Sequence, residues 1–77
     1  SYAYVAEELV THPKPIEHWE VLEKLSELPH YVNQVLLLRF FYGMTLTQVA
    51  VQTGLSISKV HRLEKAGLTQ MKEMLAG

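Results

Sequence analysis

A chain of 77 residues is long enough for one small domain, and such a domain buries only about 60% of the surface that its unfolded chain exposes. Cysteine is absent, which excludes a disulfide framework and favours a reducing compartment such as the cytoplasm, and no apolar run approaches the roughly 18 residues of a membrane span. The net charge of −1 divides unevenly: residues 1–29 carry six Glu against two Lys, and residues 30–77 carry five Lys or Arg against two Glu, so the second half is the better candidate for a nucleic-acid surface, with a chance division as the alternative.

The N-terminal part of the chain is predicted to contain two helices separated by a connector. Tyr2–Val10 has aromatic and aliphatic residues at helical spacing, whereas residues 11–15 include two prolines that prevent a helix from continuing. Ile16–Leu28 is predicted to be an amphipathic helix. The residues of this helix that are expected to face the core are Ile16, Trp19, Leu22, Leu25 and Leu28.

We therefore divide the chain into an N-terminal helix with its connector, residues 1–15, and a helical domain, residues 16–77. The first residue is Ser1 rather than Met, so we expect a piece of a longer or processed protein.

Residues 30–42 are predicted to form the central helix, because they are apolar on almost every side and such a helix packs against several neighbours. Pro29 suits its first turn and Gly43 suits its C-terminal end. The aromatic residues are expected in the core, and the alternative is that some of them form an exposed patch for a partner. The residues concerned are Trp19, Phe40, Phe41 and Tyr42, joined in the alternative by Tyr2 and Tyr4.

Two more helices, Leu46–Thr53 and Ile57–Leu75, are predicted at the C-terminal end, with a short turn between them. Thr45 and Gln48 have the spacing of a capping box at the start of the first. Ser56 is a suitable N-cap for the second.

The turn between these helices matches the pattern of a helix-turn-helix. That motif needs a small residue where the helices approach, a residue that tolerates positive φ in the turn, and apolar residues after the turn and on the inner side of the second helix. The residues at these places are Ala50, Gly54, Leu55, Val60 and Leu63. Later in the same helix Gly67 weakens it by about 1 kcal/mol relative to alanine. The sequence thus predicts an all-α fold, a small bundle of four to five helices with a C-terminal helix-turn-helix.

The outer face of the last helix is polar and basic, which predicts contact with DNA. Lys59, Arg62 and Lys65 suit phosphates. Ser58, His61 and Arg62 lie in the N-terminal part of the helix, which enters the major groove and reaches base edges in this motif. The alternative is a solvated cationic face on a structural or protein-binding module.

Several stretches of the chain resemble region 4 of bacterial sigma factors, and the resemblance covers about residues 16–76. The stretches that carry it are LP at residues 28–29, QVLLLRFFYGMTLTQVA at residues 34–50 and GLSISKVHRLEKAGL at residues 54–68. The resemblance implies a domain that reads the upstream, −35-like promoter element while docked on RNA polymerase. It also implies that apolar surfaces of the domain bind the polymerase flap, and often an anti-sigma protein.

The resemblance implies roles for individual residues. Major-groove contacts are implied for the start of the last helix, namely Ser56, Ile57, Ser58, His61 and Arg62. Phosphate contacts are implied for Arg39, Thr45 and Thr47, to which the basic face adds Lys59 and Lys65. Many members place Arg or Glu where this chain has Ile57 and Ser58, so its base specificity stays open and Ile57 could touch a thymine methyl group.

Two other functions stay open: a protein-interaction module of the same fold that binds RNA polymerase or a regulatory protein and has weak DNA affinity, and a stand-alone phage or plasmid transcription regulator. No enzyme activity is expected, because the chain lacks Asp and Cys for a nucleophilic triad and has no glycine-rich phosphate loop. No metal or cofactor is expected either, because the four histidines lie in separate segments.

Overall fold

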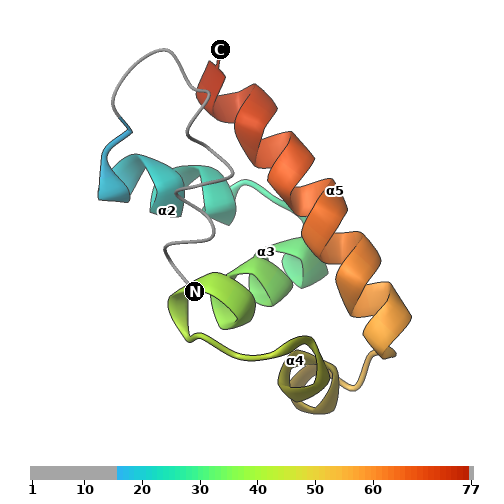
Figure 1. The fold of residues 1–77 in the computed structure, drawn as a ribbon. Coiled ribbons are helices and arrows are strands. Elements are labelled where there is room, and N and C mark those ends of the chain that lie inside the picture. Colours follow the sequence, from blue (N-terminus) through green and yellow to red (C-terminus); the bar gives the residue numbers. More distant parts are fainter. Residues whose placement is uncertain (1–15, 77) are drawn as a thin grey trace.

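Residues 16–76 are described by the computed structural model, and this part of the chain is helical with no strand (Figure 1). The elements are α2 (His18–Ser26), α3 (His30–Leu36), the π-helix η1 (Leu37–Phe41), α4 (Leu46–Thr53) and α5 (Ile57–Ala76). The all-α prediction is confirmed. The predicted helix Tyr2–Val10 and its connector lie outside the described residues. Within the described part, none of the helices combines the length and apolarity that a bilayer crossing requires.

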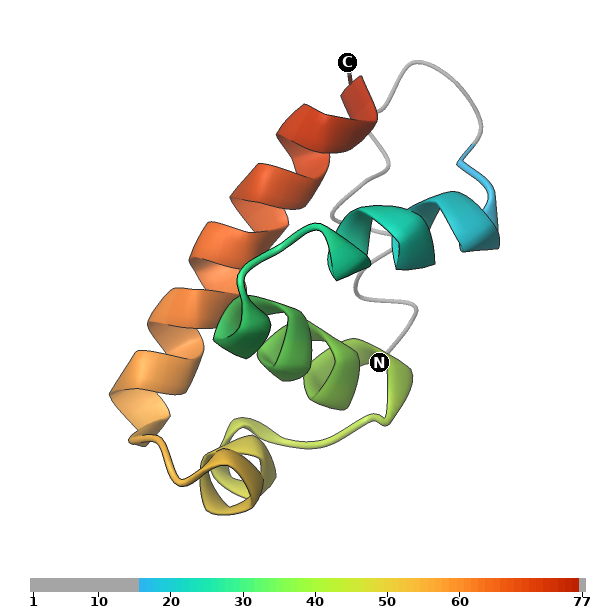
Figure 2. The same cartoon turned by 180° about the vertical axis from the view of Figure 1, so that it is seen from behind.

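α5 is the central helix of the packing arrangement, because α2, α3 and α4 all pack against it. Figures 1 and 2 show α4 beside the start of α5, α2 beside its C-terminal half, and α3 between them. The helix-turn-helix formed by α4 and α5 therefore occupies one end of the molecule, and α2 occupies the other.

The core has two parts that meet along α5. The larger cluster joins α2, α3, η1 and the second half of α5. The smaller cluster lies under the helix-turn-helix and consists of Val35, Val49, Ala50 and Val60. Leu63 packs against both clusters. The helix-turn-helix is thus attached to the rest of the bundle by a shared apolar layer. Burial of these apolar side chains is the main contribution that stabilises its position.

The predicted central helix has the expected extent but changes its hydrogen bonding halfway. The backbone N–H of Tyr42 donates to the carbonyl of Leu37 at 3.1 Å, five residues back, which gives η1 its wider turn. Gly43 ends it with a φ of +69°, as its position predicts. This wider turn carries Arg39, whose partners are described below.

The inner face of α2 was predicted correctly in part: Leu25 and Leu28 belong to the larger cluster and Ile16 packs against it, but Trp19 and Leu22 do not face the core. The buried residues of α2 are Val21 and Leu25, whereas Trp19 is 62% exposed and Leu22 41% exposed. Residues at intervals of three are separated by about 300° around the helix axis, 60° less than a full turn. The predicted core residues, which follow this interval, therefore do not all lie on one face of α2. Spacing by four, from Val21 to Leu25, keeps the buried face turned toward α5.

The aromatic residues divide between core and surface. Phe40 is 2% exposed and belongs to the larger cluster, and Phe41 packs against that cluster. Tyr42, the next residue, is 72% exposed. The expectation of a core position was therefore correct for the two phenylalanines and wrong for Trp19 and Tyr42.

Gly67 lies where α5 packs closely against α3. A Cβ at this position would lie 2.7 Å from Val32 Cγ1 and 2.8 Å from Leu36 Cδ1. Both distances are shorter than carbon atoms tolerate without displacement. The glycine that weakens α5 as an isolated helix therefore lets it pack against α3.

Candidate nucleic-acid interface

Local hydrogen bonds fix the start of α4. The backbone N–H of Gln48 donates to Thr45 Oγ1 at 3.1 Å, and the backbone N–H of Thr45 donates to Gln48 Oε1 at 2.9 Å. This is the capping box that the sequence predicts. Two of the N–H groups that a helix start leaves without backbone partners are satisfied in this way.

The turn from α4 to α5 is equally well determined. Gly54 has a φ of +77° and donates its N–H to the Ala50 carbonyl at 2.9 Å, which closes α4. Thr53 Oγ1 accepts from the N–H of Leu55 at 3.3 Å, and Ser56 Oγ accepts from the N–H of Lys59 at 3.1 Å. The predicted N-cap is therefore in place, and the direction in which α5 leaves the turn is fixed.

The inner side of the motif is apolar at each position that the pattern requires. Val60 is fully buried and Ala50 nearly so, while Leu55 and Leu63 are half-buried against the smaller cluster. With Gly54 in the left-handed conformation, all five positions of the predicted helix-turn-helix are confirmed.

The outer side of α5 presents the residues that the sequence singles out. Ser56, Ile57, Ser58, Lys59, His61, Arg62 and Lys65 are all exposed. Ser58, His61, Arg62 and Lys65 recur at the spacing of one helix face, so they share a single stripe. Thr45 and Thr47 are exposed at the start of α4, at the same end of the domain. The structure brings nine of the ten candidate residues to this end; their roles on DNA stay predictions.

Arg39 differs from the other nine candidates. Its side chain is 25% exposed, and Nε donates to Glu64 Oε1 at 2.9 Å. Nη1 donates to the Met44 carbonyl, also at 2.9 Å. The guanidinium therefore joins η1, the segment before α4 and the middle of α5.

Sequence reasoning missed Glu64, which was counted only as a charge. Among the described residues it is the one charged residue that is buried, with a side-chain exposure of 7%. The available signal was its register: Glu64 lies four residues after Val60 and four before Leu68, both on the inner stripe of α5. A charged residue at such a position requires a partner, and Arg39 is that partner.

The charges of the described residues separate along the molecule. Because Glu64 is paired with Arg39, the first half of α5 keeps an exposed excess of Lys59, Arg62 and Lys65. At the other end (Figure 2), α2 and its flanks carry Glu17, Glu20, Glu23 and Glu27 against Lys24. The helix-turn-helix end is therefore the end suited to a polyanion.

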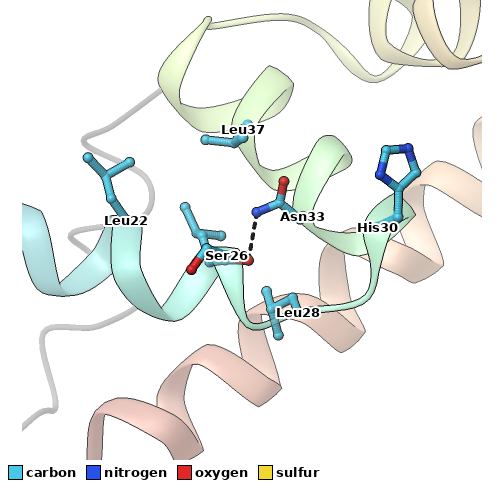
Figure 3. A pocket seen from close by; sticks show the side chains of 7 residues that line it. Leu22, Ser26, Leu28, His30, Asn33 and Leu37 are labelled. Atoms are coloured by element: carbon cyan, nitrogen blue, oxygen red, sulfur yellow. Dashed lines mark hydrogen bonds between the residues drawn. The ribbon is translucent and has the colours of Figure 1, made fainter.

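A second surface lies away from the helix-turn-helix, between α2 and α3 (Figure 3). It is an open hollow of about 390 Å³, and Asn33, one of its lining residues, links α3 to α2 by donating to the Leu25 carbonyl at 2.6 Å. Trp19 lies three residues before Leu22 on the same side of α2, and its side chain is exposed. The hollow is lined by Leu22, Leu25, Ser26, Leu28, His30, Asn33 and Leu37.

Comparison with known proteins finds RNA polymerase sigma factors. RNA polymerase sigma factor SigF of Mycobacterium tuberculosis is 44% identical over 61 residues, which make up 78% of this chain and 23% of that protein. RNA polymerase sigma-G factor of Bacillus subtilis is 35% identical over 69 residues, 90% of this chain and 26% of that protein. The sigma-G factor of Clostridium acetobutylicum is 34% identical over 58 residues, 75% of this chain and 23% of that protein.

The chain spans about a quarter of the length of these relatives. No solved structure gave a significant match. The family model for sigma-70, region 4 matches residues 24–73, which run from the last turn of α2 through α4 and most of α5. The chain therefore belongs to the sigma-70 region 4 family, a family of DNA-binding transcription domains.

Proposed function

We propose that this domain reads an upstream, −35-like promoter element in the major groove while it is docked on core RNA polymerase. The observation that carries the proposal is the exposed stripe of Ser58, His61, Arg62 and Lys65 on a rigidly capped helix start. In the helix-turn-helix motif, base edges are read from the N-terminal part of the second helix, and the remaining contacts hold phosphates. The proposed location is the cytoplasm, and the proposed unit is residues 16–77.

The proposal predicts salt-sensitive binding to DNA. Lys59, Arg62 and Lys65 are three exposed cations, and with one phosphate neutralised by each, the logarithm of the binding constant falls against the logarithm of salt concentration with a slope of about −2.7. Fluorescence anisotropy of the domain with a random duplex pool and with a duplex selected from that pool, at several salt concentrations, measures this slope. Absence of binding at low salt would refute a DNA role for the domain.

Ile57 provides a second prediction, on base reading. It is the first residue of α5, is 49% exposed, and stands beside polar neighbours on the DNA side. An exposed apolar side chain at this position suits the methyl group of thymine. Replacing the contacted thymine of the selected duplex by deoxyuridine removes that methyl group, and we expect binding to weaken by about 0.8 kcal/mol, roughly fourfold in Kd.

The matched control for this prediction is Ile57→Ala, which should bind the thymine and deoxyuridine duplexes equally well. A scan in which no thymine of the selected duplex is sensitive to loss of its methyl group would contradict the role of Ile57 and leave the DNA proposal intact.

The hollow between α2 and α3 favours a second candidate function, that of a docking module for polymerase or a regulatory protein such as an anti-sigma protein. Leu22, which lines the hollow, is 41% exposed, and Trp19 on α2 and Tyr31 on α3 are 62% and 51% exposed. A contiguous apolar surface is typical of a protein-interaction site. Trp19 is the one tryptophan of the chain, so its emission reports on this surface. A shift of that emission with core polymerase, together with no DNA binding, would favour the docking function alone.

A further inference from the structure

We propose that Arg39 acts as a positioning residue of the helix-turn-helix and not as a phosphate contact; this inference rests on the proposed DNA-binding function. The two bonds of its guanidinium end on different elements: Nε on Glu64 in α5 and Nη1 on the Met44 carbonyl, one residue before the N-cap of α4. One planar group therefore sets the start of α4 relative to the middle of α5.

The geometry explains why this position requires arginine. The guanidinium has donors in a fixed fork, so it can bridge a carboxylate and a carbonyl in one plane, whereas the ammonium of lysine is a point charge. Both acceptors lie 2.9 Å from the guanidinium nitrogens. Met44 is itself held by its N–H, which donates to the Leu38 carbonyl at 3.0 Å. The whole segment between η1 and α4 is thereby tied to α5.

The positive charge of Arg39 is already neutralised within the domain by the carboxylate of Glu64. The Glu64 side chain is 7% exposed, so its carboxylate interacts with Arg39 through little intervening water, and the pair carries no net charge. A guanidinium that left this pair for a phosphate would leave a buried carboxylate without its partner, which is strongly unfavourable. Lys59, Arg62 and Lys65 have exposed side chains on α5 and face no such penalty.

The angle between α4 and α5 matters because the second helix enters the groove while the first lies across the backbone. A small change in that angle moves every contact made by the start of α5. Loss of the Arg39 bridge should therefore weaken all specific contacts together without removing any phosphate contact.

The decisive variant is Arg39→Lys, which keeps the net charge of the domain. We expect its affinity for the selected duplex to fall about tenfold, as for the loss of a hydrogen bond to a charged group, with an unchanged salt slope. Glu64→Gln should also lose affinity although it makes the net charge more positive. The double variant, Arg39→Lys with Glu64→Gln, should lose no more affinity than the single variant that binds DNA less tightly. Lys59→Gln is the control for a true phosphate contact, and its slope should become shallower by about 0.9.

Helical circular dichroism at the assay temperature establishes that each variant is folded. Wild-type affinity in Arg39→Lys, or a shallower slope in Arg39→Gln with undiminished binding by Glu64→Gln, would overturn the positioning role. If the wild-type domain binds no DNA, the proposed function fails, and the positioning role is then read from amide hydrogen exchange. Arg39→Lys should raise exchange in residues 45–50 and leave α2 unchanged, and unchanged exchange in α4 would refute it.

Discussion

Phe40→Ala is expected to lower the free energy of unfolding by about 3–5 kcal/mol. The ring is 2% exposed and lies in the larger cluster, where α2, α3 and the second half of α5 meet. A domain of this size has a total stability toward the lower end of about 5–15 kcal/mol, so the variant should be close to unfolded at 37 °C. Urea denaturation followed by circular dichroism measures the loss.

Tyr42→Ala is the matched control, because it removes a similar ring two residues further along the same segment. Tyr42 is 72% exposed, and its replacement should change stability by less than about 0.5 kcal/mol. Equal losses in the two variants would contradict the division of these aromatic residues between core and surface.

Gly67→Val is expected to lower the free energy of unfolding by about 3 kcal/mol, although valine is a better helix former than glycine. A Cβ at this position meets Val32 Cγ1 at 2.7 Å, so the new side chain would push α5 away from α3. Thermal and urea unfolding would both show the loss.

Ala66→Val tests whether this effect comes from packing. Ala66 is exposed on the same helix, so the substitution should lower stability only by the difference in helix propensity, about 0.6 kcal/mol. Val32→Ala should rescue part of the stability lost by Gly67→Val, since it removes the methyl group that lies nearest. A stable Gly67→Val domain would refute the close approach of α3 and α5.

Features with local causes were predictable from the sequence. α4 has the predicted bounds because a capping box opens it and a glycine with positive φ closes it, and both signals lie within ten residues. The exposed stripe of α5 follows from its helical period and from the buried Val60. The family resemblance is confirmed for the same reason, since its motifs are these local signals.

Features that depend on distant contacts were not predictable in the same way. On α2, Trp19 was wrongly assigned to the core and Val21 was overlooked, because both are suitable core residues and only the position of α5 decides between them. From the sequence, Gly67 only lowers the stability of the last helix, and its role in packing becomes visible only when α3 lies against it. The role proposed for Arg39 depends on Glu64, 25 residues away, and no pattern in a single sequence reports such a pair.

The separation of charge along the domain has a consequence for how fast it finds its partner. The acidic helix α2 and the basic start of α5 lie at opposite ends of the described residues, so this part of the molecule carries an electric dipole along its length. In the electric field of a DNA duplex, this dipole orients the diffusing domain so that the start of α5 faces the DNA. Fewer collisions then arrive in an unproductive orientation, so part of the salt dependence should appear in the association rate constant, with the lifetime of the complex set by the contacts of α5.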